Sequence, residues 1–315
     1  MTRLVTGLGA WLRRRTGRGL RRASTVEARL AEHVERMADE HPPIPLDSAD
    51  YSMARPQVLG EKFGPVLNYM SRVELEVERN VIELNLLLPD PPPIDRTFYS
   101  DVWLPQETHH GLILDELQLQ AGLPQATPDL TTIDIRLRLL GALGKVSAVQ
   151  DVSRMLYYLT GVATEQSAIL AYNKLYQGLM ALGERAIALT IVGPIRRQEP
   201  GHFAYYKIAA RALWAELAPW QKWLVRTLRK QSFEVVGAYN KRQRGEFGVV
   251  MQRLGITAEG DKGILRYAEQ IGRVEKELLW AQRQGLRVPA YVVNALRNSV
   301  RLAHASAPEG GLLAS

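Results

Sequence analysis

Apolar residues recur every three or four positions along most of the chain, the spacing that lines one face of an α-helix. Runs that alternate apolar and polar residues are few, and no Asn-Gly or Asp-Gly pair lies between apolar segments to form a hairpin. We therefore expect an all-α protein. Proline and glycine mark the ends of the expected helices, which cover residues 25–40, 63–88, 97–121, 133–143, 147–182 and 184–216, with three or four more within 219–304.

The sequence contains no linker long enough to separate two domains within its 315 residues. We expect a helical bundle over residues 25–218, with additional helices over 219–305 packed on it as part of the same domain. A basic amphipathic tail over residues 1–24 and a frayed, Gly-rich tail over 306–315 would flank this domain. Within 147–182, a break near Gly161 is an alternative to one long helix.

Composition excludes several classes of site. The chain has no cysteine, so disulfide scaffolds, thiolate zinc sites and iron–sulfur clusters are excluded. Its net charge of +7 comes from residues 1–24, which carry seven arginines and no acidic residue. The remainder has 33 basic and 33 acidic residues, which argues against binding of nucleic acid by the folded part. No run of eighteen apolar residues occurs, so we expect no helix that spans a bilayer. The expected location is the cytoplasm, with peripheral membrane contact as an alternative.

Four of the expected helices carry an apolar face that is interrupted near its middle by ionisable residues. A face with this spacing is normally buried in a helical bundle. A buried carboxylate without a partner costs several kcal/mol or takes up a proton. The interrupting residues are Glu74 in the first helix, Glu107 and His110 in the second, Glu165 in the third, and Glu199 and His202 in the fourth.

Cations bound between these helices would offset the free-energy cost of burying the carboxylates. Two divalent ions balance four carboxylates, and two neutral imidazoles complete the ligand set. Glu107 with His110, and Glu199 with His202, form Glu-x-x-His pairs whose members share a helix face and can bind the same ion. The sequence therefore predicts a two-metal site.

The other two helices contribute one carboxylate each, Glu74 and Glu165, which we expect to bridge the two ions. Glu78 lies one turn after Glu74 and is an alternative ligand. This is the ligand set of ferritin-like di-iron or di-manganese carboxylate proteins. The expected fold is accordingly a ferritin-like four-helix bundle with additional N- and C-terminal helices.

Two segments resemble the soluble acyl-carrier-protein desaturases of that superfamily. The first, Gln-Glu-Thr-His-His-Gly at residues 106–111, is similar to their Glu-Glu-Asn-Arg-His-Gly. The second, Gln-Glu-Pro-Gly-His-Phe-Ala-Tyr-Tyr-Lys-Ile at residues 198–208, is similar to their Asp-Glu-Lys-Arg-His-Glu-x-x-Tyr-x-Lys-Ile. The resemblance covers roughly residues 60–215.

The resemblance implies a di-iron centre that uses O2 as co-substrate to remove hydrogens from an unactivated acyl chain. Manganese or a mixed iron–manganese pair is an alternative to two iron ions. It also implies an acidic electron donor such as ferredoxin as a partner, with acyl carrier protein as a second. Hydroxylation or N-oxygenation of a small molecule on the same centre, and a non-catalytic metal-binding helical protein, are the alternative functions.

Several residues depart from the desaturase pattern. Gln106 and Gln198 stand where the desaturases have an acid, and Ala168 where they have threonine. Pro200 and Gly201 lie inside the second Glu-x-x-His motif, where proline removes a helical hydrogen bond and favours a π-type bulge. The departures indicate a diverged member with its own substrate.

Other residues are weaker candidates. An aliphatic substrate would lie in a pocket lined by Leu114, Leu117, Ile169, Tyr172 and Leu179, for which ordinary core packing is the alternative. Trp103 and Tyr206, one turn from ligands, can carry oxidising equivalents or simply pack. A docking patch for an acidic partner would use Lys222, Arg226, Arg229, Lys230, Lys241, Arg242 and Arg244, with a solvated face as the alternative. Residues 1–24 are either a peripheral membrane contact or a solvated terminus, and a homodimer is an expected assembly.

Overall fold

The computed structural model describes residues 25–88, 91–131, 147–281 and 287–306, and all regular structure in these ranges is helical. The prediction of an all-α protein is therefore confirmed for this part of the chain. The tail predicted over 1–24, the helix predicted over 133–143, and all but the first residue of the tail predicted over 306–315 lie outside the described residues.

The first element that the structure describes is a helix over residues 25–40, as the sequence predicted. The elements that follow are a 3₁₀ turn (Leu46–Ser48), α2 (Pro56–Leu75), α3 (Val77–Leu87), α4 (Pro93–Thr97), a π-helical segment (Phe98–Trp103), α5 (Leu104–Gln120), α7 (Ser147–Leu182), α8 (Arg185–Ile187), a second π-helical segment (Ala188–Val192) and α9 (Gly193–Glu216). The C-terminal helices are α10 (Pro219–Ser232), α11 (Lys241–Arg253), α12 (Asp261–Ile271), α13 (Arg273–Glu275), a π-helical segment (Lys276–Trp280) and α15 (Ala290–Ser306).

The prediction of one helix over residues 63–88 is wrong in its bounds. The helix begins seven residues earlier, where Pro56 occupies the first turn and supplies a backbone angle already suited to a helix. It also divides at Glu76, where the backbone leaves α2 and enters α3. The Glu76 carboxylate is held at that junction by Arg72 and Arg79, each within 3.1 Å.

Two other expected irregularities are absent. α7 runs unbroken through Gly161, where an added Cβ would lie 2.4 Å from the ring of Tyr206. This glycine therefore permits close approach of α9 and does not end the helix. α9 stays α-helical through Pro200 and Gly201, whereas the neighbouring π-helical segment lies earlier, at Ala188–Val192.

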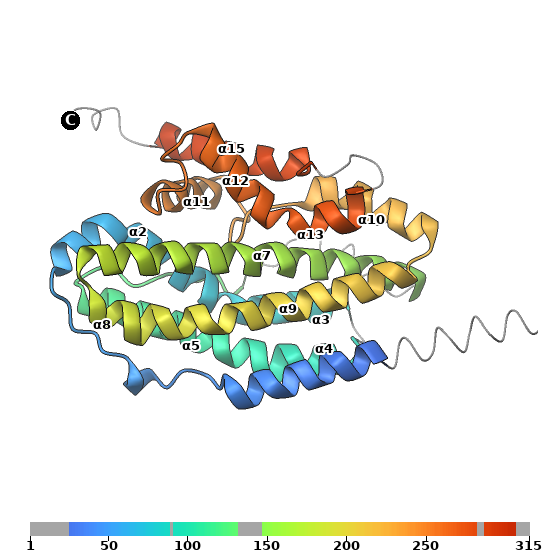
Figure 1. The fold of residues 1–315 in the computed structure, drawn as a ribbon, viewed down its shortest axis with the longest axis horizontal. Helices are drawn as coiled ribbons and strands as arrows, with labels where there is room; N and C mark the ends of the chain where they lie inside the picture. Colours follow the sequence, from blue (N-terminus) through green and yellow to red (C-terminus); the bar gives the residue numbers. More distant parts are fainter. Residues whose placement is uncertain (1–24, 89–90, 132–146, 282–286, 307–315) are drawn as a thin grey trace, which may run out of the picture.

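Four long helical segments, α2 with α3, α5, α7 and α9, form the centre of the molecule and are here called the site helices. α7 packs along α9, and α2 and α3 pack along α5 (Figure 1). Contacts of α2 and α3 with α7 join the two pairs. On one side, the helix over 25–40 lies against α9, where His33 Nε2 donates to the Gly201 carbonyl at 2.9 Å.

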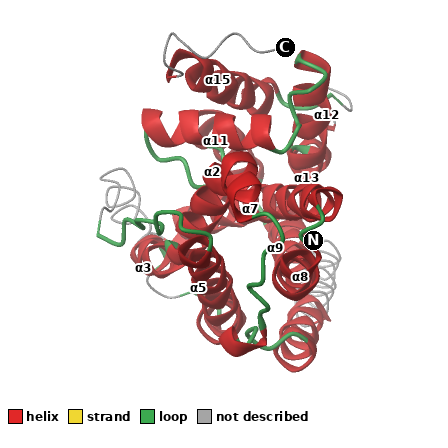
Figure 2. Cartoon of the chain, turned by 90° about the vertical axis from the view of Figure 1, so that its left-hand side faces the viewer, coloured by secondary structure: helices red, strands yellow, loops and turns green. Residues whose placement is uncertain are grey.

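The C-terminal helices form a layer on the opposite side of the site helices (Figure 2). Within this layer α11 packs closely on α15, and it contacts the site helices chiefly through α11 on α2 and through α10 and α12 on α7. No helix in the described part of the chain combines the length and apolar character needed to span a membrane.

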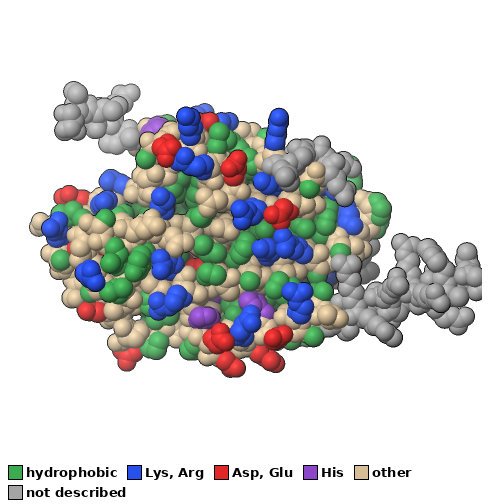
Figure 3. Space-filling view, in the orientation of Figure 1, with side chains coloured by type: hydrophobic (Ala, Val, Ile, Leu, Met, Phe, Trp, Pro, Cys, Tyr) green, Lys and Arg blue, Asp and Glu red, His purple; other side chains and the backbone are tan. Residues whose placement is uncertain are grey.

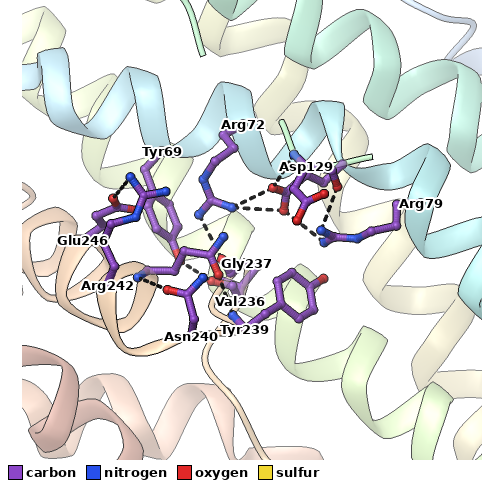
Figure 4. A network of polar contacts seen from close by, with 12 residues as sticks. Tyr69, Arg72, Arg79, Asp129, Val236, Gly237, Tyr239, Asn240, Arg242 and Glu246 are labelled. Atoms are coloured by element: carbon purple, nitrogen blue, oxygen red, sulfur yellow. Dashed lines mark hydrogen bonds and ion pairs between the residues drawn. The ribbon is translucent and has the colours of Figure 1, made fainter. Parts of the chain in front are cut away.

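A polar network fixes the 233–240 segment of this layer to α2 (Figure 4). The Tyr69 hydroxyl donates to the Val236 carbonyl at 2.5 Å, and Arg72 donates to the Gly237 carbonyl at 2.9 Å. Gly237 has a φ of +66°, a conformation that side chains rarely adopt, and an added Cβ would lie 2.2 Å from Val73. The network therefore fixes the position of the C-terminal layer over α2.

Candidate metal centre

The site helices bring the six predicted ligands together in the interior. The described residues contain two groups of ionisable side chains whose ligand atoms lie within 4.8 Å of one another. One group is Glu74, Glu107, His110 and Glu199, and the other is Glu107, Glu165, Glu199 and His202. All six side chains are buried, with Glu74 the most exposed at 7%.

Each site helix places its ligands between two apolar clusters. Trp103, directly before α5, belongs to one cluster and Ile113 of α5 to the other, with the first Glu-x-x-His motif between them. On α9, Ile195 and Tyr205 flank the second motif in the same way. The polar centre is therefore a thin layer enclosed by hydrophobic core at both ends, which excludes water from it.

Glu107 and Glu199 occupy the central positions. The two oxygens of Glu107 each lie 3.0 Å from an imidazole Nδ1, one from His110 and the other from His202. The oxygens of Glu199 approach the same two nitrogens at 3.4 and 3.8 Å. Both carboxylates belong to both groups, so they are placed to bridge two ions.

Glu74 and Glu165 lie at the outer ends, each in one group only. The grouping therefore favours Glu107 and Glu199 as bridging carboxylates over Glu74 and Glu165, which the sequence analysis expected to bridge. Tyr172 donates a hydrogen bond of 2.6 Å to Glu74, and Trp103 Nε1 donates one of 3.3 Å to Glu165. Each outer carboxylate thus has one oxygen held by an aromatic side chain, which limits how it can turn.

Several ligand atoms have no hydrogen-bond partner among the described residues, although they are buried. They are both carboxylate oxygens of Glu199 and Nδ1 of His202, which lie 3.0–3.8 Å from oppositely charged neighbours but without the alignment of a hydrogen bond. Leaving buried polar atoms unpaired costs about 1–3 kcal/mol each, and more when the group is charged. The unpaired atoms face the shared volume of the two groups, which is where a cation would satisfy them.

The imidazoles are oriented by glutamines from the opposite motif. His202 Nε2 donates to the Gln106 amide oxygen, and His110 Nε2 donates to the Gln198 amide oxygen, both at 2.6 Å. An amide oxygen only accepts, so this bond keeps a proton on Nε2, and in the neutral imidazole Nδ1 is then the nitrogen with the lone pair. Sequence reasoning recorded these glutamines as departures and missed this function, although their position directly before each motif glutamate was the available signal.

The glutamine amides are in turn held by the segment after the first helix. Gln106 Nε2 donates to the His41 carbonyl at 2.5 Å, and Gln198 Nε2 donates to the Pro42 carbonyl at 2.8 Å. His109, next to a predicted ligand, points away from the centre, and its Nδ1 lies 2.8 Å from the Ile44 carbonyl. The backbone carbonyls of residues 41–44 therefore contact both motifs, and through the two glutamines they help to hold the imidazoles in position.

The close packing of charges shifts the ionisation of the site. Burial, reinforced by neighbouring Glu107, holds the pKa of Glu74 well above its usual range. Burial also raises the pKa of Glu165 to about 8, against an opposing hydrogen bond with His202. Burial alone would lower the pKa of His110, but hydrogen bonds with Glu107 and Glu199 outweigh it and raise that pKa to about 9. Near neutral pH, protons therefore occupy the positions that cations can take.

The remaining predicted residues lie as follows. Glu78, in the first turn of α3, is exposed and outside both groups, so α2 with α3 supplies only Glu74. Of the predicted substrate-pocket residues, Leu114, Leu117 and Leu179 are fully buried in the core, Ile169 is half-buried, and only Tyr172 lines a cavity.

The predicted basic docking patch is scattered in the structure. Arg229 is wrong as a member, because it is buried and donates to Glu275 at 2.7 Å. Arg244 is paired with Glu234 at 2.6 Å, whereas Lys222 and Lys230 lie over the rings of Trp214 and Trp280. On the face of the molecule drawn in Figure 3, Lys and Arg side chains are spread among acidic and apolar ones.

Comparison of the chain with protein-family models, curated proteins and solved structures found no match.

Proposed function

We propose that this protein is a ferritin-like di-metal oxidoreductase, with the site helices as its four-helix bundle and Glu74, Glu107, His110, Glu165, Glu199 and His202 as the ligands. The observation that supports this most strongly is the pair of interlocking ligand groups, which share two carboxylates and contain one imidazole each. The proposed activity is O2-dependent oxidation of an aliphatic or acyl chain.

The donor set suits two divalent cations such as iron or manganese. Carboxylate oxygen and imidazole nitrogen are ligands that these ions accept, and no softer sulfur donor is needed. Four carboxylates balance two divalent ions, which removes the cost of burying them. The unpaired oxygens of Glu199 and the unpaired Nδ1 of His202 are the atoms that such ions would engage.

When bound, two iron ions would supply the reduction of O2 and the oxidising power needed to break an unactivated C–H bond. The protein's own residues hold and orient this group. Gln106 and Gln198 keep the imidazoles in one tautomer, and Tyr172 and Trp103 hold the outer carboxylates. The two apolar clusters exclude water, which protects a reactive site from side reactions.

Metal analysis of the purified protein tests the site. We expect about two equivalents of metal per chain. Glu107→Ala, which removes a shared ligand, should abolish binding of both ions. The matched variants Glu74→Gln and Glu78→Gln test whether Glu74 is the ligand from this part of the chain. The two residues are one turn apart, but only Glu74 lies in the metal centre. The assignment is wrong if the two variants lose the same amount of metal.

Product analysis tests the reaction class. Iron-loaded protein supplied with a reductant, O2 and a carrier-bound or free acyl chain should remove two hydrogens from the chain. A product that gains one oxygen atom would instead indicate hydroxylation on the same centre. Glu78→Gln serves as the active control, and His202→Ala as the metal-depleted one.

A further inference from the structure

Helix α10 carries two tryptophans that project into solvent. Trp220 is 49% exposed and Trp223 is 58% exposed, whereas Trp103 and Trp280 are buried. The two exposed residues are three positions apart on the helix, so their side chains lie on the same side of it. Tryptophan is strongly buried on average, and exposed apolar surface of this kind marks a site of interaction with a protein or a membrane.

The packing of α10 does not require these two side chains. The opposite side of the helix supplies the buried residues Gln221, Val225 and Arg229. Val225 is fully buried in an apolar cluster, and Arg229 is paired with Glu275 at 2.7 Å. The inward side therefore holds α10 in the fold, and the outward side is left for another purpose.

Positive charge accompanies the exposed indoles. The segment 219–232 contains four basic residues, Lys222, Arg226, Arg229 and Lys230, and no acidic residue. Lys230 is exposed and lies seven residues after Trp223, a spacing that returns to the same side of a helix. Thr227, between them, continues this side. The outward face of α10, defined here as Trp220, Trp223, Thr227 and Lys230, thus combines apolar area with a cation.

Two further cations lie along one edge of this outward face. Lys222 Nζ lies 5.5 Å from the ring centre of Trp214, and the Arg226 guanidinium lies 5.0 Å from it. Attraction to the ring holds both charges beside α10.

Few carboxylate charges oppose these cations. Glu234, which follows α10, accepts a hydrogen bond from Arg244 at 2.6 Å, and Glu277 accepts one from Arg211 at 2.7 Å. Glu216 at the end of α9 is exposed, but the cations of α10 outnumber it. This surface is therefore positively charged around its two indoles.

The sequence adds more positive charge at the same end of the molecule. The helix over 25–40 begins at the end where α9 stops and α10 starts (Figure 1). Leu30 of this helix and Val225 of α10 belong to one apolar cluster. Residues 1–24, directly before this helix, contain seven arginines and no acidic residue. The chain thus enters the fold with a strongly basic segment at the end that carries the exposed tryptophans.

We propose that the outward face of α10 docks on an anionic lipid surface. Indole has an apolar body and a polar N–H, which suits the boundary between acyl chains and headgroups. The neighbouring lysine and arginine charges suit the phosphates of anionic lipids. An acidic protein would match the charges, but it would not supply the apolar layer into which two projecting indoles can enter. The proposal does not depend on the metal centre or on the proposed function.

Sedimentation of the full chain with vesicles tests this proposal. The unchanged protein should bind vesicles of phosphatidylglycerol and phosphatidylcholine in equal parts, should bind less at high salt, and should not bind pure phosphatidylcholine. Trp220→Ser with Trp223→Ser should weaken binding by about tenfold or more, because both apolar anchors are lost. Leu112→Ser with Leu119→Ser, at exposed positions on α5, is the matched control and should bind like the unchanged protein.

The charges are tested with a second pair of variants. Lys222→Gln with Lys230→Gln should weaken binding by about fivefold for each charge removed. Lys62→Gln with Lys262→Gln removes two exposed lysines of α2 and α12 and should have no such effect. Circular dichroism checks that all four variants remain folded.

Three outcomes of these experiments overturn the proposal. The first is that the tryptophan variant binds anionic vesicles as well as the unchanged protein does. The second is equal binding to both kinds of vesicle. The third is an unchanged protein that stays in the supernatant with both, which is the result expected if α10 instead binds an acidic protein.

Fluorescence quenching locates the contact on the molecule. The experiment uses a Trp11→Phe background, which removes the indole of residues 1–24. Phosphatidylcholine with brominated acyl chains, mixed into the anionic vesicles, should then quench the tryptophan emission. This quenching should disappear when Trp220→Phe and Trp223→Phe are added. Quenching that persists would assign the contact to another surface and reject the role of α10.

Discussion

The amide oxygen of Gln106 on α5 accepts a hydrogen bond from Nε2 of His202 on α9 at 2.6 Å. Gln198 on α9 makes the same bond back to His110 on α5. Each Glu-x-x-His motif is thus oriented by the glutamine that precedes the other motif. A neutral amide fixes the imidazole without adding negative charge to a centre that already holds four carboxylates.

Removal of this support should weaken metal binding. Gln106→Leu deletes the partner of His202 Nε2, and loss of such a supporting bond costs about 10- to 100-fold in metal affinity. Competition with a chromophoric chelator measures the change. Gln120→Leu, at an exposed position on the same helix, is the control and should leave affinity unaltered. Equal affinities in the two variants would contradict the orienting role.

The metal-free protein should lose stability as the pH rises from about 6.5 to 9. The pKa of His110 is raised to about 9 and that of Glu165 to about 8, so both groups hold protons more tightly in the folded chain. Stability from such groups is present at low pH and is lost as the pH rises through the folded-state pKa. Chemical denaturation at several pH values measures this loss.

The metal-loaded protein provides the contrast for that experiment. Its ligands are already deprotonated, so its stability should change little over the same pH range, and metal uptake should release protons. A metal-free protein that becomes more stable between these pH values would contradict the assigned ionisation.

Gly161→Ala should destabilise the protein by about 1–3 kcal/mol, because the new methyl group would overlap the ring of Tyr206. Gly245→Ala on α11 is the matched control, since its nearest neighbour would lie at an ordinary 3.6 Å. There, replacement of glycine in a helix should be neutral or stabilising. Urea denaturation of both variants measures the difference, and similar losses would contradict the close approach of α7 and α9.

Arg229→Ala should cost about 3–5 kcal/mol, because it leaves Glu275 buried without its cation. The pair lies in the interface of α10 with α13, at a distance of 2.7 Å. Arg211 pairs with Glu277 at the same distance but on the surface. Arg211→Ala should therefore cost no more than about 1 kcal/mol, and comparable losses in both variants would be inconsistent with burial of Arg229.

Helical periodicity predicted much of the fold because it reports directly on which helix faces are buried. α7, the helix over 25–40 and the placement of both Glu-x-x-His motifs on inward faces follow from it. The division at Glu76 was not predictable in this way. It depends on Arg72, Arg79 and the backbone N–H of Asp129, which the fold brings together from outside the local pattern.

In the candidate site, too, local sequence pattern predicted which residues are buried, whereas tertiary packing decides how they are arranged. Glutamates on apolar helix faces identified the candidate ligands, since the apolar residues around each one show in the sequence that its side chain is buried. Which carboxylates are shared between two groups is a matter of helix position, and spacing alone suggested Glu74 and Glu165 where geometry favours Glu107 and Glu199.

An anomalous difference map from crystals of the metal-loaded protein tests the central claim most directly. The account predicts two peaks inside the site helices, each bound by one imidazole through Nδ1, with Glu107 and Glu199 reaching both and Glu74 and Glu165 reaching one each. A single peak, no peak at these six side chains, or imidazoles bound through Nε2 would contradict it.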